Sequence, residues 1–150
     1  MSENKTYVSC RVDSVLLGID LGRVREINRT VDVTPVPRTN DAVRGLVNLR
    51  GELVTVLDLG QLLLGKPSSL QRTSRNVILR TEDESVGLLV DWVGDVVEAA
   101  GKKIEPVPFE VHGMDAGMFA GVIQLDSGLM VVLDVDAVTQ PAEARERGTS

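Results

Sequence analysis

Two stretches of the chain repeat each other closely enough to constrain the whole fold. Residues 45–58, GLVNLRGELVTVLD, align without a gap with residues 121–134, GVIQLDSGLMVVLD, and six of the fourteen aligned pairs are identical. A second pair precedes them in the same order, because residues 34–37, TPVP, resemble residues 105–108, EPVP. Repeats in a conserved order indicate a chain built from two copies of one unit. The sequence therefore predicts two similar lobes.

Strand-sized apolar segments fill both halves of the chain. Runs rich in Val, Ile and Leu, broken by Gly, Pro, Asn and Asp, lie at residues 7–12, 14–19, 32–36, 45–49, 53–57, 76–81, 85–90, 93–97, 118–125 and 129–133. Such a density of short strands predicts a mainly β fold of small barrels or sandwiches. We place the seam between the two barrel lobes in the loop at residues 65–69, GKPSS, although small barrels often exchange their terminal strands.

Helical signals are brief. Three short helical segments are predicted, at residues 58–65, 20–27 and 134–140. In the first, Asp58 with Gln61 three residues later resembles a capping box, and Gly65 suits the position after the last helical turn. Asp20 and Asp134 are expected to cap the other two segments.

Composition excludes several classes of function. The formal net charge is −6, the isoelectric point is near 4.8 and only four residues are aromatic. Nucleic-acid binding rests on clustered Lys and Arg, and single-strand binding adds exposed aromatic side chains. A nucleic-acid-binding small barrel is therefore a distant alternative, and we expect no nucleic-acid partner.

Catalytic and metal-binding chemistry finds little support. The chain has one cysteine, Cys10, and one histidine, His112, which cannot form a tetrahedral zinc site without several carboxylates. No nucleophile motif lies near His112, and the adjacent Asp83 and Glu84 fall in a loop signal. We predict no catalytic residues, no metal and no cofactor, and hence a protein that is not an enzyme.

The chain shows no targeting or spanning segment. Its first residues lack a charged region followed by an apolar one, and no apolar run approaches the 18 residues that a membrane helix needs. We therefore expect a soluble cytoplasmic protein that does not insert into membranes. Residues 1–5 and 140–150 are expected to be flexible ends, since the tail is charged and poor in apolar residues.

Three blocks of sequence resemble a known family. Residues 45–51, GLVNLRG, followed by residues 54–59, VTVLDL, resemble the G-hydrophobic-hydrophobic-N-L-R-G…P-V-hydrophobic-D-L signature of the CheW family, the coupling proteins of bacterial chemotaxis arrays. Residues 18–27, GIDLGRVREI, are similar to its G-I-D…V-x-E-I segment, and residues 86–96, VGLLVDWVGDV, to its V-G-hydrophobic-hydrophobic-V-D…V-x-D/E-V segment. The blocks occur in the family order.

The resemblance covers residues 6–139 and departs from the pattern at two positions. Thr55 stands where the family usually has proline, and Gly60 where a positive residue commonly follows Asp-Leu. The resemblance implies one domain of two SH3-like five-stranded β-barrels with short helices, in agreement with the duplication. It also implies a non-catalytic adaptor that joins the cytoplasmic tips of chemoreceptors to the regulatory domain of the histidine kinase CheA. The protein would then lie at membrane-associated receptor arrays through its partners.

A related alternative stays open. The same fold serves chemosensory-like pathways that control pilus motility, development or biofilm formation, and the output is chosen downstream of the adaptor. The sequence alone does not separate these pathways.

The resemblance implies a receptor-facing surface at Val24, Glu26, Gly45 and Arg50. Val24 would supply apolar contact, Gly45 would permit close backbone approach, and Glu26 with Arg50 would form an ion pair at the groove's edge. Purely structural roles remain open: Val24 in the core, Gly45 in strand curvature and the ion pair as a link within the first lobe. Arg50 is the least explained structurally, because it aligns with Asp126 in the other copy.

A kinase-facing surface is predicted in residues 28–38, NRTVDVTPVPR. There Val31, Val33 and Val36 lie between polar residues and two prolines, a composition suited to a protein-binding loop at one end of a barrel. Trp92, the only tryptophan, is expected to pack on its own barrel, with a contact role as the alternative.

Overall fold

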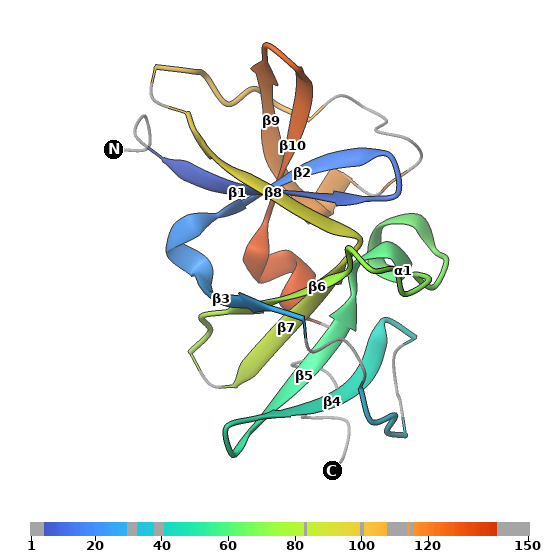
Figure 1. Ribbon diagram of the computed structural model, residues 1–150. Helices are drawn as coiled ribbons and strands as arrows, with labels where there is room; N and C mark the ends of the chain where they lie inside the picture. The colour runs from blue at the N-terminus through green and yellow to red at the C-terminus, as the bar shows by residue number, and fades with distance from the viewer. Residues whose placement is uncertain are drawn as a thin grey trace.

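In the computed structural model, the described residues form mostly strands, ten of them in two sheets (Figure 1). The structure describes residues 5–29, 33–37, 41–82, 84–99, 101–107, 114 and 116–140. Predictions on Val31, His112, Asp83 and the tail beyond residue 140 lie outside the described residues.

The first sheet combines strands from both ends of the chain. Its strand order is β8-β1-β2-β10-β9, formed by β1 (Thr6–Val12), β2 (Val15–Asp20), β8 (Trp92–Glu98), β9 (Phe119–Leu125) and β10 (Gly128–Leu133). Neighbouring strands are antiparallel except β10 and β2, which run parallel. The N-terminal hairpin thus completes a sheet whose other strands come from the second half of the sequence.

The second sheet has the same number of strands and the same arrangement. Its order is β3-β6-β7-β5-β4, formed by β3 (Val24–Asn28), β4 (Val43–Leu49), β5 (Glu52–Asp58), β6 (Arg75–Leu79) and β7 (Ser85–Val90). One parallel pair, β5 with β7, again sits among antiparallel ones. The predicted mainly β fold of two five-stranded units is confirmed. The loop at residues 65–69 leads into β6 of this same sheet.

One large apolar core joins the two sheets. The alternating pattern of β1 buries Val8, Cys10 and Val12 as the sequence predicts, and they share a cluster with Leu57 of β5 and Leu88 of β7. Each sheet adds a smaller cluster of its own. Because burial of aliphatic side chains is the main stabilising term in folding, this shared core holds the two sheets in one body.

The duplication appears in the structure as two equivalent chain crossings. Thr34 pairs with Leu46 through two backbone hydrogen bonds of 2.9 Å, and Glu105 pairs with Val122 through two more of 2.9 Å. Each crossing passes over the glycine that precedes the paired residue on β4 or β9. A Cβ atom on Gly45 would lie 2.3 Å from the Thr34 carbonyl oxygen. The repeated Gly and Pro-Val-Pro segments are therefore two parts of one packing motif.

Two of the three predicted helical segments are present. Helix α1 (Leu59–Leu64) begins after Asp58, whose side chain accepts a hydrogen bond from the Gln61 amide, and ends at Gly65 in the left-handed conformation. Residues 135–140 are helical, and Asp134 accepts a hydrogen bond from the Ala137 amide at 3.1 Å. The aspartate that closes each sequence repeat thus caps a helix in both copies.

Two local predictions hold only in part. Residues 20–27 do not form a longer helical turn: a 3-10 turn, η2 (Leu21–Arg23), leads directly into β3. Asp20 does cap this turn, because its side chain accepts a hydrogen bond from the Gly22 amide at 2.9 Å. The chain then pairs with β6 from Val24 onward, and this ladder limits the helical segment to one turn. Residues 33–36, predicted to lie in a strand, form only the single bridge at Thr34, since prolines 35 and 37 cannot donate to a ladder.

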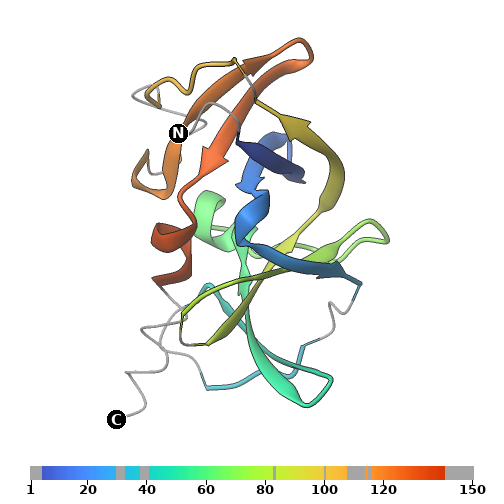
Figure 2. The same cartoon turned by 90° about the vertical axis from the view of Figure 1, so that its left-hand side faces the viewer.

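One edge strand of each sheet, β8 of the first and β3 of the second, lies on the same side of the molecule, one above the other (Figures 1 and 2). A second 3-10 turn, η3 (Ala116–Met118), precedes β9. In the part of the chain that the structure describes, no helix is long and apolar enough to cross a membrane.

Candidate functional site

The tip of the β4–β5 hairpin is a two-residue turn under backbone strain. Leu49 and Glu52 are paired across it, and Arg50 and Gly51 form the turn with φ angles of 52° and 88°. Turns of this kind favour Asn-Gly, because both central residues need positive φ. The Asn48 side chain accepts a hydrogen bond from the Gly51 amide at 2.9 Å. An arginine at this position is thus not required by the turn and is disfavoured by its geometry.

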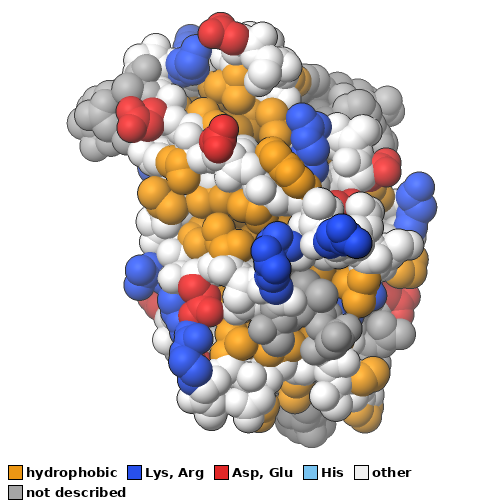
Figure 3. Space-filling view, viewed as in Figure 1, with side chains coloured by type: hydrophobic (Ala, Val, Ile, Leu, Met, Phe, Trp, Pro, Cys, Tyr) orange, Lys and Arg blue, Asp and Glu red, His pale blue; other side chains and the backbone are white. Residues whose placement is uncertain are grey.

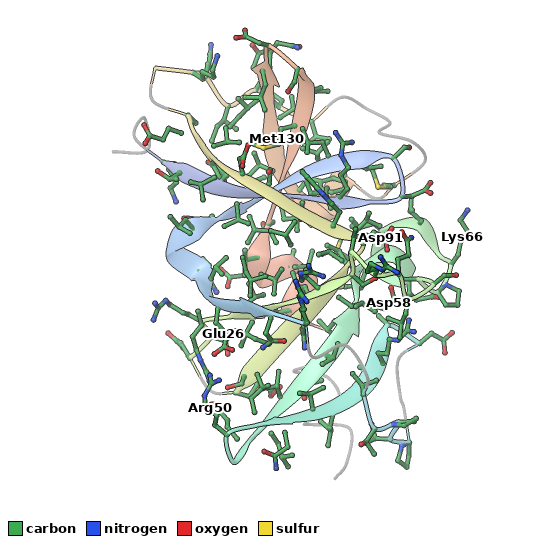
Figure 4. All side chains as sticks on the ribbon, in the orientation of Figure 1. Glu26, Arg50, Asp58, Lys66, Asp91 and Met130 are labelled. Carbon is green, nitrogen blue, oxygen red and sulfur yellow. The ribbon has the colours of Figure 1, made fainter. Side chains whose placement is uncertain are left out.

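The structure brings Glu26 and Arg50 together. The Arg50 guanidinium donates to one carboxylate oxygen of Glu26, and the Asn28 amide donates to the other at 3.0 Å. First the Asn28 hydrogen bond and then Arg50 lower the pKa of the Glu26 carboxyl below its ordinary value. The pair lies on the edge of the molecule opposite Asp58 and Lys66 (Figure 4). The Arg50 side chain is 68% exposed, against 25% for Glu26, so the arginine is the member of the pair that faces solvent.

Val24 and Gly45 take internal positions. Val24 is buried and belongs to the shared core, so it offers little surface to a partner. The backbone that closely approaches Gly45 is the chain's own crossing at Thr34, and Gly45 also has a φ of 152°. A direct receptor contact by either residue stays a prediction.

Exposed apolar side chains occur on η2, β3 and β8, and of these only Trp92 was considered as a contact residue from the sequence. Ile27 on β3 is 39% exposed and Val96 on β8 is 54% exposed, while Leu21 on η2 and Trp92 on β8 are exposed as well. Figure 3 shows an apolar surface over β8, with charged side chains at the lower left margin of the same face. Apolar side chains exposed on the outward face of an edge strand are the signal that would have found this surface.

Trp92 lies flat on its own strand. A Cβ atom on Gly94 would lie 1.9 Å from the indole ring, so the ring occupies the space that a side chain at position 94 would fill. The Arg11 guanidinium carbon lies 5.7 Å from the ring centroid, within the range of a cation–π contact. The expectation that Trp92 packs on its own barrel agrees with this geometry.

The described part of the predicted kinase-facing segment borders a hollow. Val33 and Val36 are partly buried, against different core clusters, and both line a concave surface together with Arg44, Asp58 and Ser68. The segment is therefore an exposed edge supported by the core, and its role in binding stays a prediction.

Asp58 organises the floor of this hollow. Its buried carboxylate accepts hydrogen bonds from Arg44 at 2.8 Å, from the Ser68 amide at 2.8 Å and from the Ser68 hydroxyl at 2.7 Å. A Cβ atom on Gly60 would lie 2.4 Å from that hydroxyl, which explains why glycine replaces the positive residue common in the family pattern. The hydrogen bonds of Asp58 and the close approach of Ser68 to Gly60 fix the loop after α1 against β4 and β5.

A second ion pair lies beside the first. Arg25 of β3 donates to both carboxylate oxygens of Glu52, at 2.6 and 3.2 Å, and the Ser85 hydroxyl donates to Glu52 as well. Arg25 is the main cause that lowers the pKa of Glu52 to about 2, with Ser85 second. Within the described residues, no group of three or more His, Cys, Asp or Glu side chains is placed to hold a metal ion.

The sequence and the fold of the chain match one family. The CheW-like domain model matches residues 6–143, and the chain belongs to the CheW-like family. It is 30% identical over 144 residues to the chemotaxis protein CheW of Rhizobium meliloti, with 95% of this chain and 91% of that one covered. It is 27% identical to the chemotaxis protein CheW of Thermotoga maritima, covering 93% and 90% of the two chains.

A solved structure supports the same assignment. The crystal structure of the scaffolding protein TtCheW from Thermoanaerobacter tengcongensis superposes with a TM-score of 0.79 at 26% sequence identity, covering 88% of this chain and 85% of that one. The resemblance read from the sequence motifs is therefore confirmed.

Proposed function

We propose that this protein is a non-catalytic coupling protein that joins chemoreceptor tips to the regulatory domain of the histidine kinase CheA. Its relatives are named as chemotaxis proteins, and the structural relative is described as a scaffold. The single observation that carries the receptor-binding part is the exposed Arg50, which has a strained backbone and is paired with Glu26. Strained positions that the fold itself does not need are frequent at functional sites.

The receptor would dock against the surface that joins this pair to the apolar side chains of β3 and β8. A receptor tip is a helical hairpin, and an amphipathic helix binds by placing its apolar face against apolar side chains and its polar edge against charges. Ile27 and Val96 offer the apolar contact, and Arg50 offers guanidinium donors beyond the one that Glu26 uses. Val24, two residues before Glu26 on β3, anchors this strand in the shared core.

The test measures binding to a receptor tip fragment and to a kinase regulatory domain from the same genome. Arg50→Ala is expected to weaken receptor binding at least about tenfold, as for a central contact residue, and to leave kinase binding unchanged. Glu26→Gln should weaken receptor binding as well. Asp126→Ala, at the aligned position of the other hairpin, is the matched control and should change neither affinity. Wild-type protein that binds neither partner would refute the adaptor role.

The kinase contact is proposed at Val33 and Val36, together with Val31. A kinase domain of similar fold would pair end to end with this lobe, and apolar side chains at a barrel end suit such an interface. Val33→Asp is expected to weaken kinase binding, with receptor binding kept. Because Val33 also touches a core cluster, the melting temperature must be measured alongside. Kinase affinity equal to that of the wild type in a folded Val33→Asp variant would remove this surface from the interface.

The place of the protein in the cell follows from its partners in this proposal. Bound to receptor tips and kinase, it would be held at membrane-associated arrays in the cytoplasm. Loss of polar or clustered fluorescence of a tagged Arg50→Ala protein, with the wild type clustered, is the expected observation.

A further inference from the structure

A β-bulge turns two consecutive side chains of β3 toward the same hairpin. Val24 pairs with Leu79 and Glu26 with Ile78, so Arg25 is the extra residue of the bulge. In a regular strand, consecutive side chains point to opposite faces. Here both Arg25 and Glu26 reach the β4–β5 hairpin, because a bulge re-aims the side chains around it.

The result is four charges in two crossed pairs. The hairpin supplies Arg50 and Glu52 on either side of Gly51, and β3 supplies Glu26 and Arg25. The hairpin and β3 therefore each carry one positive and one negative group. Every charge has an ion-pair partner and a second opposite charge nearby. The coulombic contribution of Arg50 to the lowered pKa of Glu52, and of Arg25 to that of Glu26, reflects this proximity.

The Arg25–Glu52 pair is the more firmly held of the two. Two guanidinium nitrogens of Arg25 donate hydrogen bonds to the Glu52 carboxylate, and one of them also donates to the Ser85 hydroxyl at 3.1 Å. Ser85 is buried at the start of β7, paired with Val54 on the same strand as Glu52. By contrast, Glu26 is the only partner of Arg50 among the described residues, and a Cβ on Gly51 would meet nothing within 4 Å.

We propose that Arg25 and Glu52 are positioning residues that keep each other's charge away from the Glu26–Arg50 pair. With Arg25 absent, the freed Glu52 carboxylate competes with Glu26 for Arg50 from two residues away. With Glu52 absent, the freed Arg25 competes with Arg50 for Glu26. Loss of either Arg25 or Glu52 would therefore turn the exposed Arg50 guanidinium away from the receptor. The inference rests on the proposed receptor contact of Arg50 and assigns the neighbouring pair a role in presenting it.

The test is a double-substitution cycle with Arg25→Gln, Glu52→Gln and both together. Each single variant is expected to bind the receptor fragment about three- to tenfold more weakly, a range typical of coupled neighbours. The double variant, in which no charge is left to compete, should return to within about twofold of the wild type. Kinase binding should stay the same throughout. A double variant as weak as the singles, or singles that bind like the wild type, would overturn the proposal.

A second measurement separates this inference from the proposed function. The pKa of the Glu26 carboxyl is followed by NMR titration in the free protein, where the described side chains that lower it are Asn28, Arg50 and Arg25. It is expected to rise in Arg25→Gln, because the Arg25 charge is lost and Arg50 turns to Glu52. It should fall back in part in the double variant, where Arg50 returns to Glu26 while the Arg25 charge is still absent. This result with no receptor binding by the wild type would leave the charge arrangement standing and refute only the receptor role. An unchanged pKa in Arg25→Gln would refute the arrangement itself.

Discussion

Replacing Arg50 by glycine should make the hairpin more stable than replacing it by alanine. Both changes remove the ion pair with Glu26 equally, so the comparison isolates the backbone. With φ at 52°, alanine keeps the left-handed strain and glycine releases it, a difference of about 1 kcal/mol. For a chain of this size, that corresponds to a melting temperature about 2–4 °C higher for Arg50→Gly than for Arg50→Ala.

The other hairpin supplies an internal control with the opposite sign. Asp126 aligns with Arg50 but does not have a positive φ. Where an ordinary residue fits the backbone, glycine is the less stable choice, by about 0.4–1 kcal/mol relative to alanine. Thermal and urea unfolding, followed by circular dichroism, should therefore rank Gly above Ala at position 50 and Ala above Gly at position 126. Equal stabilities at position 50, or the same order at both positions, would refute the strain argument.

Receptor binding separates strain from function in the same variants. Arg50→Gly and Arg50→Ala both lack the guanidinium and should lose receptor affinity alike, although one is more stable than the other. A receptor affinity that instead followed the melting temperature would make Arg50 a structural residue.

Three further outcomes are expected. Asp58→Ala should destabilise the fold by about 3 kcal/mol in urea unfolding, because it leaves Arg44 without its buried partner; a loss within error would contradict the role given to this network. The Cys10 thiol is fully buried and its pKa is raised to about 12, so its reaction with a thiol reagent at pH 8 should occur only at the rate of unfolding. The Glu52 pKa is depressed from 4.5 to about 2, so its stabilising contribution is present above pH 4.5 and is lost as the pH falls toward 2. The melting temperatures of wild type and Glu52→Gln should therefore differ at pH 6 and converge near pH 2.

The elements predicted correctly are those whose signal is local or repeated. The alternation of Val8, Cys10 and Val12 and the capping pattern of Asp58 reflect contacts within a few residues, and both are seen in the structure. The repeat predicted equivalent hairpins, because two copies of a pattern reveal which positions the architecture requires. Each of these predictions needed no knowledge of distant residues.

The elements missed are those decided by distant partners. β3 follows a capping aspartate that favours a helical turn, and only its ladder with β6, about fifty residues later in the sequence, makes it a strand. The bulge at Arg25 and the pairing of Arg25 with Glu52 depend on the same ladder, so no local pattern indicates them. Val24 was assigned to the binding surface by resemblance, and the side chain that is exposed on this strand is Ile27.

Comparison of the two hairpins separates what the fold needs from what this protein does with it. Both hairpins share the glycine under a chain crossing and the aspartate that caps a helix, so these positions are architectural. They differ at the tip, where the first has Arg50 in a strained turn and the second has Asp126 in an unstrained one. The strain and the crossed charges are therefore additions to a duplicated frame. Because only one copy carries them, we expect them to serve a contact that the second hairpin does not make.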